Sequence, residues 1–423
     1  MKPFILKLLI IAVASLYMMS CSKKRDEPPK PSSSPPVTEE PSVESPSQSY
    51  PYGTELNFCP DVDDDESLRR SYMANSTGEY IVVLKEENTN GARTGREDRV
   101  NRFLSRRPLS SKPSLTYQHN FSGFVGQMTP EEAEELSKDP EVESVEPDRI
   151  ISIEQEDVEI ASLSSNQITP WGIRRVGGFA SGKGKVAWVL DTGIDLTHPD
   201  LNVDKERSIS FINGSASPDD DNGHGTHVAG TIAAIDNEIG VVGVAAGATV
   251  VAVKVMNAEG KGRISSIIRG VEYVTENANR GDVINFSLGG AGISPALERS
   301  VDNATKKGIY LAMAAGNSST YACLNSPQRM NGPFLYTVSA MDVNDNFASF
   351  SNYGTGPVDY CAPGVRVIST SPGGTYSYSS GTSMAAPHVA GLLLLHGDNF
   401  STSGYVNKDP DNIPDPIAFR KQG

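Results

Sequence analysis

The stretch from residue 381 to residue 391, GTSMAAPHVAG, constrains the fold of this chain more than any other. Gly381 allows a sharp turn, Thr382 can cap a helix, and the apolar run 389–395 predicts that the helix is buried. Ser383 is therefore expected at the start of a buried helix. A hydroxyl there lies near free backbone N–H groups, where it can attack a carbonyl and where the resulting oxyanion is stabilised.

A serine in this role needs a base, and His224 in the stretch NGHGTHVAG (222–230) is the candidate. Glycines on both sides leave its imidazole room to approach a substrate. Asp191 ends the apolar run 186–190, which puts a carboxylate at the carboxyl end of a buried strand, where open α/β sheets build their sites. The chain order is Asp, His, Ser, and only the subtilisin order of this triad matches it.

These three blocks resemble the subtilisin family of serine peptidases, and the stretch AAGN at 314–317 is similar to the family's oxyanion-hole segment. The resemblance extends over residues 171–395. It implies a triad of Asp191, His224 and Ser383, with the Asn317 side chain and the Ser383 N–H holding the oxyanion. The alternative is purely structural, with Ser383 as a helix cap and His224 as a core histidine.

The periodicity from residue 171 onward alternates between strand and helix. Buried strands are predicted at 186–190, 249–256, 283–287, 309–314 and 335–341, and helices at 225–235, 264–279 and 295–307. This order predicts an α/β domain over residues 167–400, with a doubly wound parallel sheet of subtilisin type. The acidic, Pro-rich tail 401–423 departs from the family pattern, and either closes the core or leaves it less stable.

An earlier segment, residues 78–155, predicts a small α+β domain. Strands are expected at 79–84, 115–120, 123–128 and 142–153, with helices at 95–107 and after Thr129, which begins a capping box. This is the split βαβ, ferredoxin-like pattern. It resembles the family's propeptide, which implies a folding template and an intramolecular inhibitor; the alternative is a separate binding domain. The polar loop 156–166 is where we expect the enzyme to cut itself.

The N-terminus predicts export. Residues 1–20 combine two lysines with a short apolar run, as in a secretory signal. Cleavage before Cys21 would resemble a bacterial lipoprotein with a lipid anchor there, and ordinary signal cleavage is the alternative. Residues 21–77 are rich in Pro, Ser and acidic residues and are expected to form a disordered linker, in which Cys59 stays unpaired. The predicted location is the cell envelope or the extracellular medium.

The resemblance also places the substrate between two edge segments, as an added extended strand. These segments are Ser287, Leu288 and Gly289 on one side and Gly260, Lys261 and Gly262 on the other, the alternative for 260–262 being an ordinary surface turn. A primary pocket for fairly large apolar side chains is expected between Gly289, Ala314, Ala315 and Gly316, and a second apolar pocket at Ile264.

A structural Ca²⁺ site is a further implication of the resemblance. Its expected ligands are the side chains of Asp200, Asn237 and Gln167 and the carbonyls of Ile235, Ile239 and Val241, an all-oxygen shell of the kind that Ca²⁺ prefers. A weaker site is expected at Asp359 with the carbonyls of Pro333 and Leu335. Cys323 and Cys361 lie near positions that are bridged in some family members, which implies a disulfide.

The net charge of the chain limits the classes of molecule that it can bind. A net charge of −15 argues against nucleic acid and anionic membranes, because binding to either needs clustered positive charge. Peptides and the chain's own propeptide remain as partners, with a membrane contact only through a lipid anchor at Cys21, and a monomer is expected. The predicted function is an exported, autoprocessed serine endopeptidase of broad specificity with a preference for apolar P1 residues. The alternative is a catalytically silent member that binds peptides.

Overall fold

A computed structural model describes residues 76–86, 93–153, 159–161, 166–289 and 292–421. The signal segment, Cys21, Cys59 and most of the linker predicted from the sequence lie outside these residues. Within the described ranges, the helices are all too short or too polar to cross a membrane.

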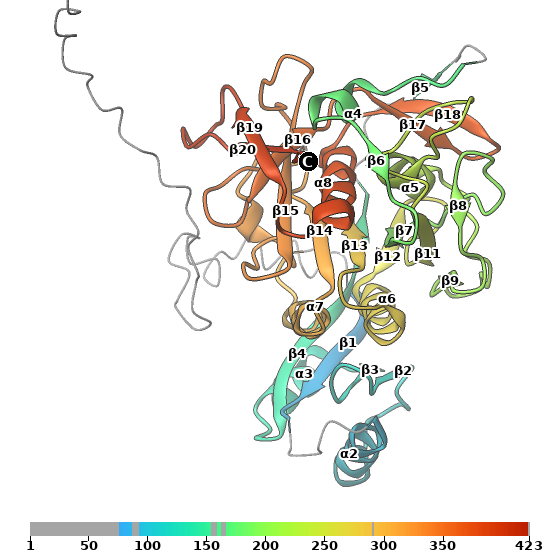
Figure 1. Ribbon diagram of the computed structural model, residues 1–423. Coiled ribbons are helices and arrows are strands. Elements are labelled where there is room, and N and C mark those ends of the chain that lie inside the picture. The colour runs from blue at the N-terminus through green and yellow to red at the C-terminus, as the bar shows by residue number, and fades with distance from the viewer. Residues whose placement is uncertain (1–75, 87–92, 154–158, 162–165, 290–291, 422–423) are drawn as a thin grey trace, which may run out of the picture. The chain divides into compact units, whose positions relative to one another are not determined.

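The described part of the peptidase region is built on a ten-stranded sheet (Figure 1). The strand order is β19-β20-β16-β15-β14-β13-β7-β11-β8, with β9 also paired to β11. Every pair on this path is parallel except β19 with β20. The strands are β7 (Val186–Asp191), β8 (Asn202–Val203), β9 (Ile209–Ser210), β11 (Thr249–Lys254), β13 (Val283–Phe286), β14 (Tyr310–Ala314), β15 (Leu335–Met341), β16 (Tyr360–Pro363), β19 (Ser401–Tyr405) and β20 (Pro416–Phe419).

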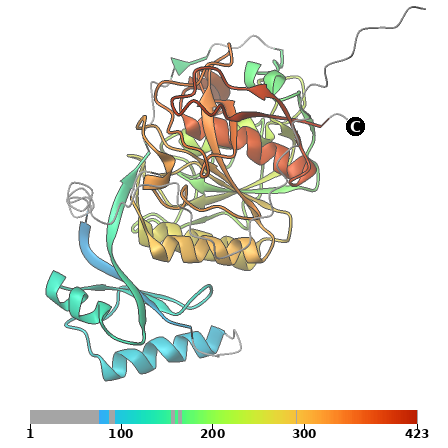
Figure 2. The same cartoon turned by 90° about the vertical axis from the view of Figure 1, so that its left-hand side faces the viewer.

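Helices cover both faces of this sheet, as predicted for a doubly wound fold. Helices α5 (His224–Ala233) and α8 (Thr382–His396) share one apolar core, and α6 (Ile264–Asn277) and α7 (Pro295–Lys306) share the other. Figure 2 shows α7 and α8 on opposite sides of the strands. Helix α8 is apolar all round, which is typical of a helix enclosed by its neighbours. The predicted strand and helix bounds in this region hold within two residues.

The C-terminal tail adds strands to the edge of the sheet. Of the two alternatives for the tail, the structure supports the one in which it closes the core. Strand β20 pairs in parallel with β16, where Ile417 lies opposite Cys361. Ile417 and Val406 pack with Cys361 and Met341 in a small apolar cluster. The sheet therefore continues past residue 400, where the sequence analysis ended the domain.

Smaller elements surround this sheet. They are α4 (Trp171–Arg175), η2 (Ala322–Leu324), the pair β6 (Ala180–Ser181) and β10 (Ala245–Ala246), and a three-stranded sheet of β17 (Val367–Ser371), β18 (Thr375–Ser379) and β5 (Glu159–Ile160). Strand β5 belongs to the loop where self-cleavage is expected, and it pairs with β18 on the peptidase.

The disulfide expected between Cys323 and Cys361 is absent, because Cys361 is a buried free thiol. Cys361 lies inside β16 and packs into the cluster under the tail strand. Cys323 lies in the separate short helix η2. Each thiol is thus embedded in its own element.

The small N-terminal domain has the predicted order of strands and helices. Its elements are β1 (Ser76–Leu84), α2 (Arg93–Arg106), β2 (Leu115–Tyr117), β3 (Gly123–Gln127), α3 (Pro130–Ser137) and β4 (Val142–Ser152), with the antiparallel strand order β4-β1-β3-β2. The capping box is present, because Glu132 N donates to Thr129 Oγ1 at 3.2 Å and Thr129 N donates to Glu132 Oε2 at 2.8 Å. The strand predicted at 115–120 ends three residues earlier, at Tyr117.

This domain packs on α6 and α7 of the peptidase. Tyr117 and Phe121 enter the same apolar cluster as Ile267 of α6. Two carboxylates of β4 bind the starts of the two helices: Asp148 accepts from Ser265 N at 3.0 Å, and Glu146 accepts from Ala296 N at 2.9 Å. Both helix N-termini thus receive a carboxyl group from outside the peptidase region, whose oxygen accepts from a free N–H group of the first turn and favours this docking.

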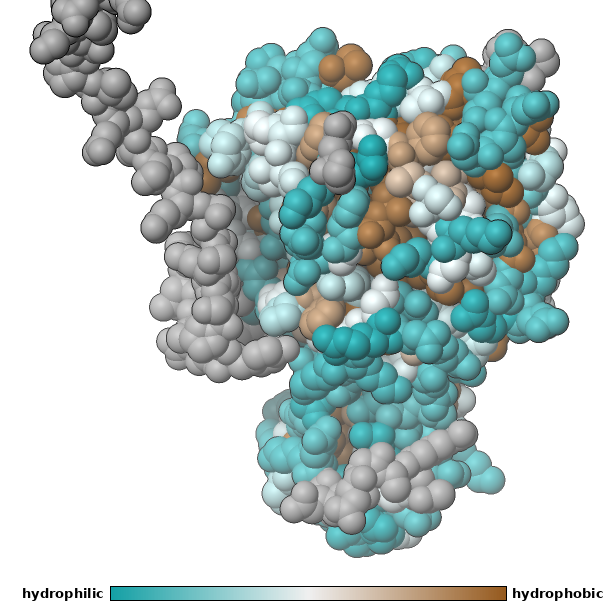
Figure 3. All heavy atoms as spheres, viewed as in Figure 1, coloured by the Kyte–Doolittle hydropathy of each residue, from teal (hydrophilic) through white to brown (hydrophobic). Residues whose placement is uncertain are grey.

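The surface seen in Figure 3 is largely hydrophilic, and apolar side chains break it in separate groups. Large apolar side chains that are exposed in the described ranges are spread over the chain: Ile150, Ile160, Ile239, Tyr321, Val343, Tyr405 and Ile413. Single exposed apolar residues of this kind are normal for a folded domain.

Candidate active site

The carboxyl ends of two neighbouring strands form the floor of the site. Asp191 is the last residue of β7, and Ser287 follows the end of β13. The register pairs Val189 with Asn285, so the same parallel register carries Asp191 to the level of Ser287 on the next strand. Two of the predicted site residues therefore lie side by side at one edge of the sheet.

Asp191 and His224 form a buried hydrogen bond. His224 Nδ1 lies 2.7 Å from Asp191 Oδ1, and both side chains are buried. The same carboxylate oxygen accepts from Thr192 N at 2.7 Å, which fixes its direction. Since an Nδ1–H donated to a carboxylate leaves Nε2 as an acceptor, this pairing sets the tautomer of a base. Nε2 has no hydrogen-bond partner among the described residues.

Ser383 reaches the same edge from the first turn of α8. Its Oγ–H donates to Ser287 O at 3.3 Å, and Ser287 Oγ donates back to Ser383 O at 3.0 Å. The hydroxyl is therefore bound to the strand end and forms no hydrogen bond with His224 in the described structure. Helices α5 and α8, which carry His224 and Ser383 at their starts, pack in one core.

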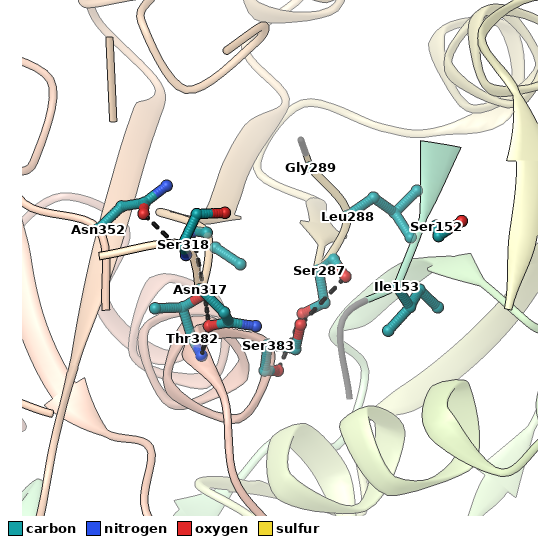
Figure 4. Close-up of a pocket in the computed structure, with 12 residues that line it drawn as sticks. Ser152, Ile153, Ser287, Leu288, Gly289, Asn317, Ser318, Asn352, Thr382 and Ser383 are labelled. Carbon is teal, nitrogen blue, oxygen red and sulfur yellow. Dashed lines mark hydrogen bonds between the residues drawn. The ribbon is translucent and has the colours of Figure 1, made fainter. Parts of the chain in front are cut away.

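Asn317 and Ser383 direct two N–H donors at one small space. Asn317 Oδ1 accepts from Thr382 N and Thr382 Oγ1, each at 2.8 Å, and the amide nitrogen points toward Ser383 (Figure 4). A Cβ atom built on Gly381 would lie 3.4 Å from Asn317 Nδ2 and 3.7 Å from Ser383 N. Only glycine leaves this space open for an oxygen. The predicted cap by Thr382 is absent, because its hydroxyl orients Asn317 instead.

The pocket in front of these residues also touches the N-terminal domain. Its lining is Ser152, Ile153, Ser287, Leu288, Gly289, Ala314, Gly316, Asn317, Ser318, Asn352, Thr382 and Ser383. Strand β4 pairs antiparallel with β12 (Lys261–Arg263), and Ile153 N donates to Gly260 O at 2.8 Å. The segment 260–262 is thus the edge strand to which the end of the small domain is added. Ile264, the first residue of α6, is buried beside Ile151.

The comparisons with known proteins agree with this geometry. The subtilase family matches residues 182–401, about half of the chain. This chain belongs to the subtilase family. The peptidase inhibitor I9 family matches residues 79–154, which cover the small N-terminal domain. The subtilase is 47% identical to the M-protease of Shouchella clausii over 267 residues, which cover 62% of this chain and 67% of that protein.

Two further relatives extend the comparison. The alkaline serine exoprotease A of Vibrio alginolyticus is 38% identical over 292 residues, 66% of this chain and 52% of that protein. The crystal structure of a cold-adapted subtilisin-like serine proteinase matches with a TM-score of 0.53 and 35% identity, covering 61% of this chain and 100% of the other. The subtilase is a serine endopeptidase, and its I9 domain makes it a zymogen with an intramolecular inhibitor.

Two residues of the subtilase site were missed by the sequence analysis. Gln328 Nε2 donates to Leu288 O at 2.7 Å and Ala314 O at 3.0 Å, so one buried amide joins both walls of the pocket. Asn352 accepts from Ser318 N at 3.0 Å and donates to Ala315 O at 2.9 Å, which holds the loop that carries Asn317. Neither residue stands in a motif, and nothing local to it signals these long-range contacts.

The residues expected to bind Ca²⁺ in the subtilase lie together. Asn237 Nδ2 donates to Asp200 Oδ1 at 2.8 Å, and Gln167 Nε2 donates to the carbonyls of Ile235 and Val241 at 2.8 and 3.2 Å. Two side-chain amides thus point into a group of oxygens. Burial raises the pKa of Asp200, whose carboxyl is partnered by amide, hydroxyl and backbone donors. A cation would compensate this buried carboxylate, and the donor set fits Ca²⁺ once the Asn237 and Gln167 amides turn their oxygens, and not their N–H groups, toward it.

Other groups near this set were not expected. Tyr376 OH donates to Asp200 Oδ2 at 3.3 Å, and Ile239 N donates to Asn237 Oδ1 at 2.8 Å. Within the described ranges, no three or more His, Cys, Asp or Glu side chains are arranged to hold a metal. The set around Asp200 is of another kind, because it holds one carboxylate and otherwise carbonyl and amide oxygens.

Asp359 is fixed within the sheet. Its Oδ2 accepts from Thr337 N at 2.8 Å, and burial raises its pKa to about 7. The expected partner Leu335 begins the adjacent strand β15. Burial raises the pKa of Asp415 in the tail to about 8, and the nearby carboxyl group of Asp359 adds to this shift.

Proposed function

We propose that this chain is an exported serine endopeptidase in which Asp191, His224 and Ser383 form the catalytic triad. The observation that carries the proposal is the buried hydrogen bond from His224 Nδ1 to Asp191 Oδ1, which leaves Nε2 without a hydrogen-bond partner among the described residues. A buried imidazole nitrogen without a hydrogen-bond partner lowers the stability of the fold, and such a cost is typical of a functional site. Abstraction of a proton is the function that its tautomer suits.

The proposed mechanism begins with rotation of the Ser383 side chain away from Ser287 O toward His224 Nε2. His224 takes the hydroxyl proton while Oγ attacks the peptide carbonyl, and Asp191 stabilises the imidazolium that forms. The carbonyl oxygen becomes negative between Asn317 Nδ2 and Ser383 N, which both border the space beside Gly381 and would donate to it. His224 then protonates the leaving amine, and water hydrolyses the acyl-enzyme by the reverse path.

Substrate binding is proposed to copy the contact of the propeptide. Strand β4 pairs with β12 through Lys261 and Gly262, and Ile153 N donates to Gly260 O. A substrate strand added to the same edge would be held by backbone hydrogen bonds, with sequence preference left to the pockets. The described residues that line the pocket are uncharged, and the Leu288 and Ala314 side chains are apolar, which supports the predicted apolar P1 preference.

Labelling with a fluorophosphonate tests the enzyme against the silent, peptide-binding alternative. Processed wild-type chain should react with the reagent at Ser383, and Ser383→Ala should not. Ser380→Ala is the matched control, since that hydroxyl accepts only from Arg366 N at the surface. A processed wild type that does not react would favour the silent alternative.

Self-processing has its own test. Because the propeptide lies in the cleft of the same chain, Ser383→Ala should accumulate as the uncut precursor. Mass spectrometry of the purified variant measures the cut. Normal maturation of Ser383→Ala would assign the cut to another protease.

Calcium is proposed as a structural ion at Asp200, Asn237 and Gln167. Added Ca²⁺ at one hundred times its Kd should stabilise the folded chain by about 2.7 kcal/mol. Thermal unfolding of the Ser383→Ala chain, with and without chelator, measures the effect without self-digestion. Asp200→Asn should abolish it. An unchanged melting temperature after chelation would contradict the proposed site.

Export is proposed from the N-terminal segment, with the lipid anchor at Cys21 as the specific form. Metabolic labelling with palmitate should mark the wild-type chain and not Cys21→Ala. Labelling of neither protein, with both found in the medium, would favour ordinary signal cleavage.

A further inference from the structure

The helix that carries His224 begins with three N–H groups that its own N-cap does not bind. The N-cap of α5 is Gly223, which has no side chain. His224 N donates to Asn222 Oδ1 at 3.1 Å, and Gly225 N donates to Thr192 Oγ1 at 3.0 Å. The third, Thr226 N, donates to Asp220 Oδ2 at 2.9 Å. The first turn is therefore capped by side chains from two different loops.

Asp220 joins these two loops. Its Oδ1 accepts from Thr192 Oγ1 at 2.8 Å and from Asn222 N and Gly223 N at 3.1 and 2.9 Å, while Oδ2 also accepts from Thr226 Oγ1 at 2.6 Å. Together with the Thr226 N contact, five donors meet one buried carboxylate. One donor comes from Thr192, the residue after Asp191, two come from the loop before α5 and two from Thr226 in its first turn.

The two segments also touch through their backbones. A Cβ atom built on Gly225 would lie 2.1 Å from Gly193 O and 3.0 Å from the Asp191 Cβ atom, so the helix start rests on the turn after β7 with no space between them. Segments packed this closely can fit together in only one relative position. Asp220 accepts hydrogen bonds from both of them, from Thr192 after β7 and from Thr226 in α5. The neighbouring Lys254 Nζ donates to Thr192 O on the same turn.

We propose that Asp220 is a positioning residue, which holds the His224 imidazole and the Asp191 carboxylate in register for proton transfer by tying α5 to Thr192. The inference rests on the proposed triad. Neither Asp220 nor any residue that donates to it lines the pocket, so we expect it to act on the chemical step through His224 more than on substrate binding. A small displacement of a reacting group lowers the rate strongly, by as much as about 100-fold for about 1 Å.

The test compares kcat and KM of purified, processed variants on a short peptide anilide. Asp220→Asn should lower kcat by about 10- to 100-fold with KM changed less than about twofold. Asp219→Asn is the matched control, because it removes a carboxylate charge one residue before Asp220. The Asp219 side chain is exposed and accepts only from Leu196 N. Asp219→Asn should match the wild type.

A second pair of variants covers the case in which Asp220→Asn does not fold. Thr192→Val keeps the shape but removes both hydroxyl contacts, and Thr192→Ser restores them. We expect Thr192→Val to lower kcat by about tenfold and Thr192→Ser to recover most of it. Proton NMR adds a direct readout, because the downfield signal of the His224 Nδ1–H should shift or broaden in Asp220→Asn and Thr192→Val.

The outcomes separate the two proposals. If His224→Ala keeps wild-type activity, the triad is wrong whatever Asp220 does. If His224→Ala is inactive while Asp220→Asn or Thr192→Val keeps kcat within a factor of two, only the positioning role is overturned. A loss carried by KM, or an unchanged His224 proton signal, would overturn it as well.

Discussion

Replacement of Asp148 should weaken the hold of the propeptide on the peptidase. Asp148 is fully buried at the start of α6, where Ser265 N and Ser265 Oγ donate to it at 3.0 and 2.7 Å. Alanine leaves both donors without their acceptor. Hydrogen bonds to a charged group contribute about 1.5–3 kcal/mol each, and water can return to part of the site. We therefore expect a loss of about 3 kcal/mol, which is roughly 150-fold in Ki.

The assay is inhibition of the mature enzyme by an added propeptide of residues 76–153, with and without Asp148→Ala. Circular dichroism of each free peptide corrects for its own folding. Glu134→Gln is the matched control, because Glu134 is an exposed residue of α3 that pairs only with Lys138. Its Ki should equal that of the wild type.

A double-mutant cycle with Ser265→Ala on the enzyme isolates the contact. Since the Ser265 hydroxyl donates to Asp148, the second replacement should cost less once the first is made. Equal Ki values for the Asp148→Ala and Glu134→Gln peptides, or a coupling energy near zero, would refute the view that this buried carboxylate anchors the propeptide.

Three other expectations follow from buried groups. Burial raises the pKa of Glu146 and Glu272 at the propeptide contact from 4.5 to about 7, so the complex binds protons that its separated parts do not. Its affinity is greatest below about pH 4.5 and falls as the pH rises toward 7, and Glu272→Gln should flatten a plot of log Ki against pH. Gln328→Ala removes the amide between the pocket walls, so the ratio of kcat/KM for P1 Phe over P1 Ala should rise by about 10-fold, and an unchanged ratio would exclude a role in specificity. Cys361 should take up alkylating reagent in unreduced, unfolded protein; a blocked Cys361 thiol would mean that it forms a disulfide.

Local patterns predicted the elements well. The run 186–190 shows as a strand because every residue in it is apolar, and the capping box at Thr129 is a contact between residues three apart. The blocks around Asp191, His224 and Ser383 were found for the same reason, since each is a short stretch of unusual composition. Features whose cause lies within a few residues are visible in a sequence.

The strands of the C-terminal tail, in contrast, could not be predicted from a local pattern. Strand β20 covers only four residues, too few for a periodic signal, and it is a strand because β16 offers it an edge. The prediction of a disulfide was wrong for a related reason. Whether Cys323 and Cys361 meet depends on the packing of η2 and β16, and each thiol is enclosed separately.

The sequence by itself therefore determined most of the strands and helices, and it marked the three blocks from which the triad of Asp191, His224 and Ser383 is proposed. The tertiary structure alone decided the long-range contacts around these blocks: Thr382 with Asn317, Gln328 with both pocket walls, and Thr192 with Asp220. These contacts join residues that are distant in the chain, and a hydrogen bond of that kind depends on the register between packed elements, which leaves no local pattern to find.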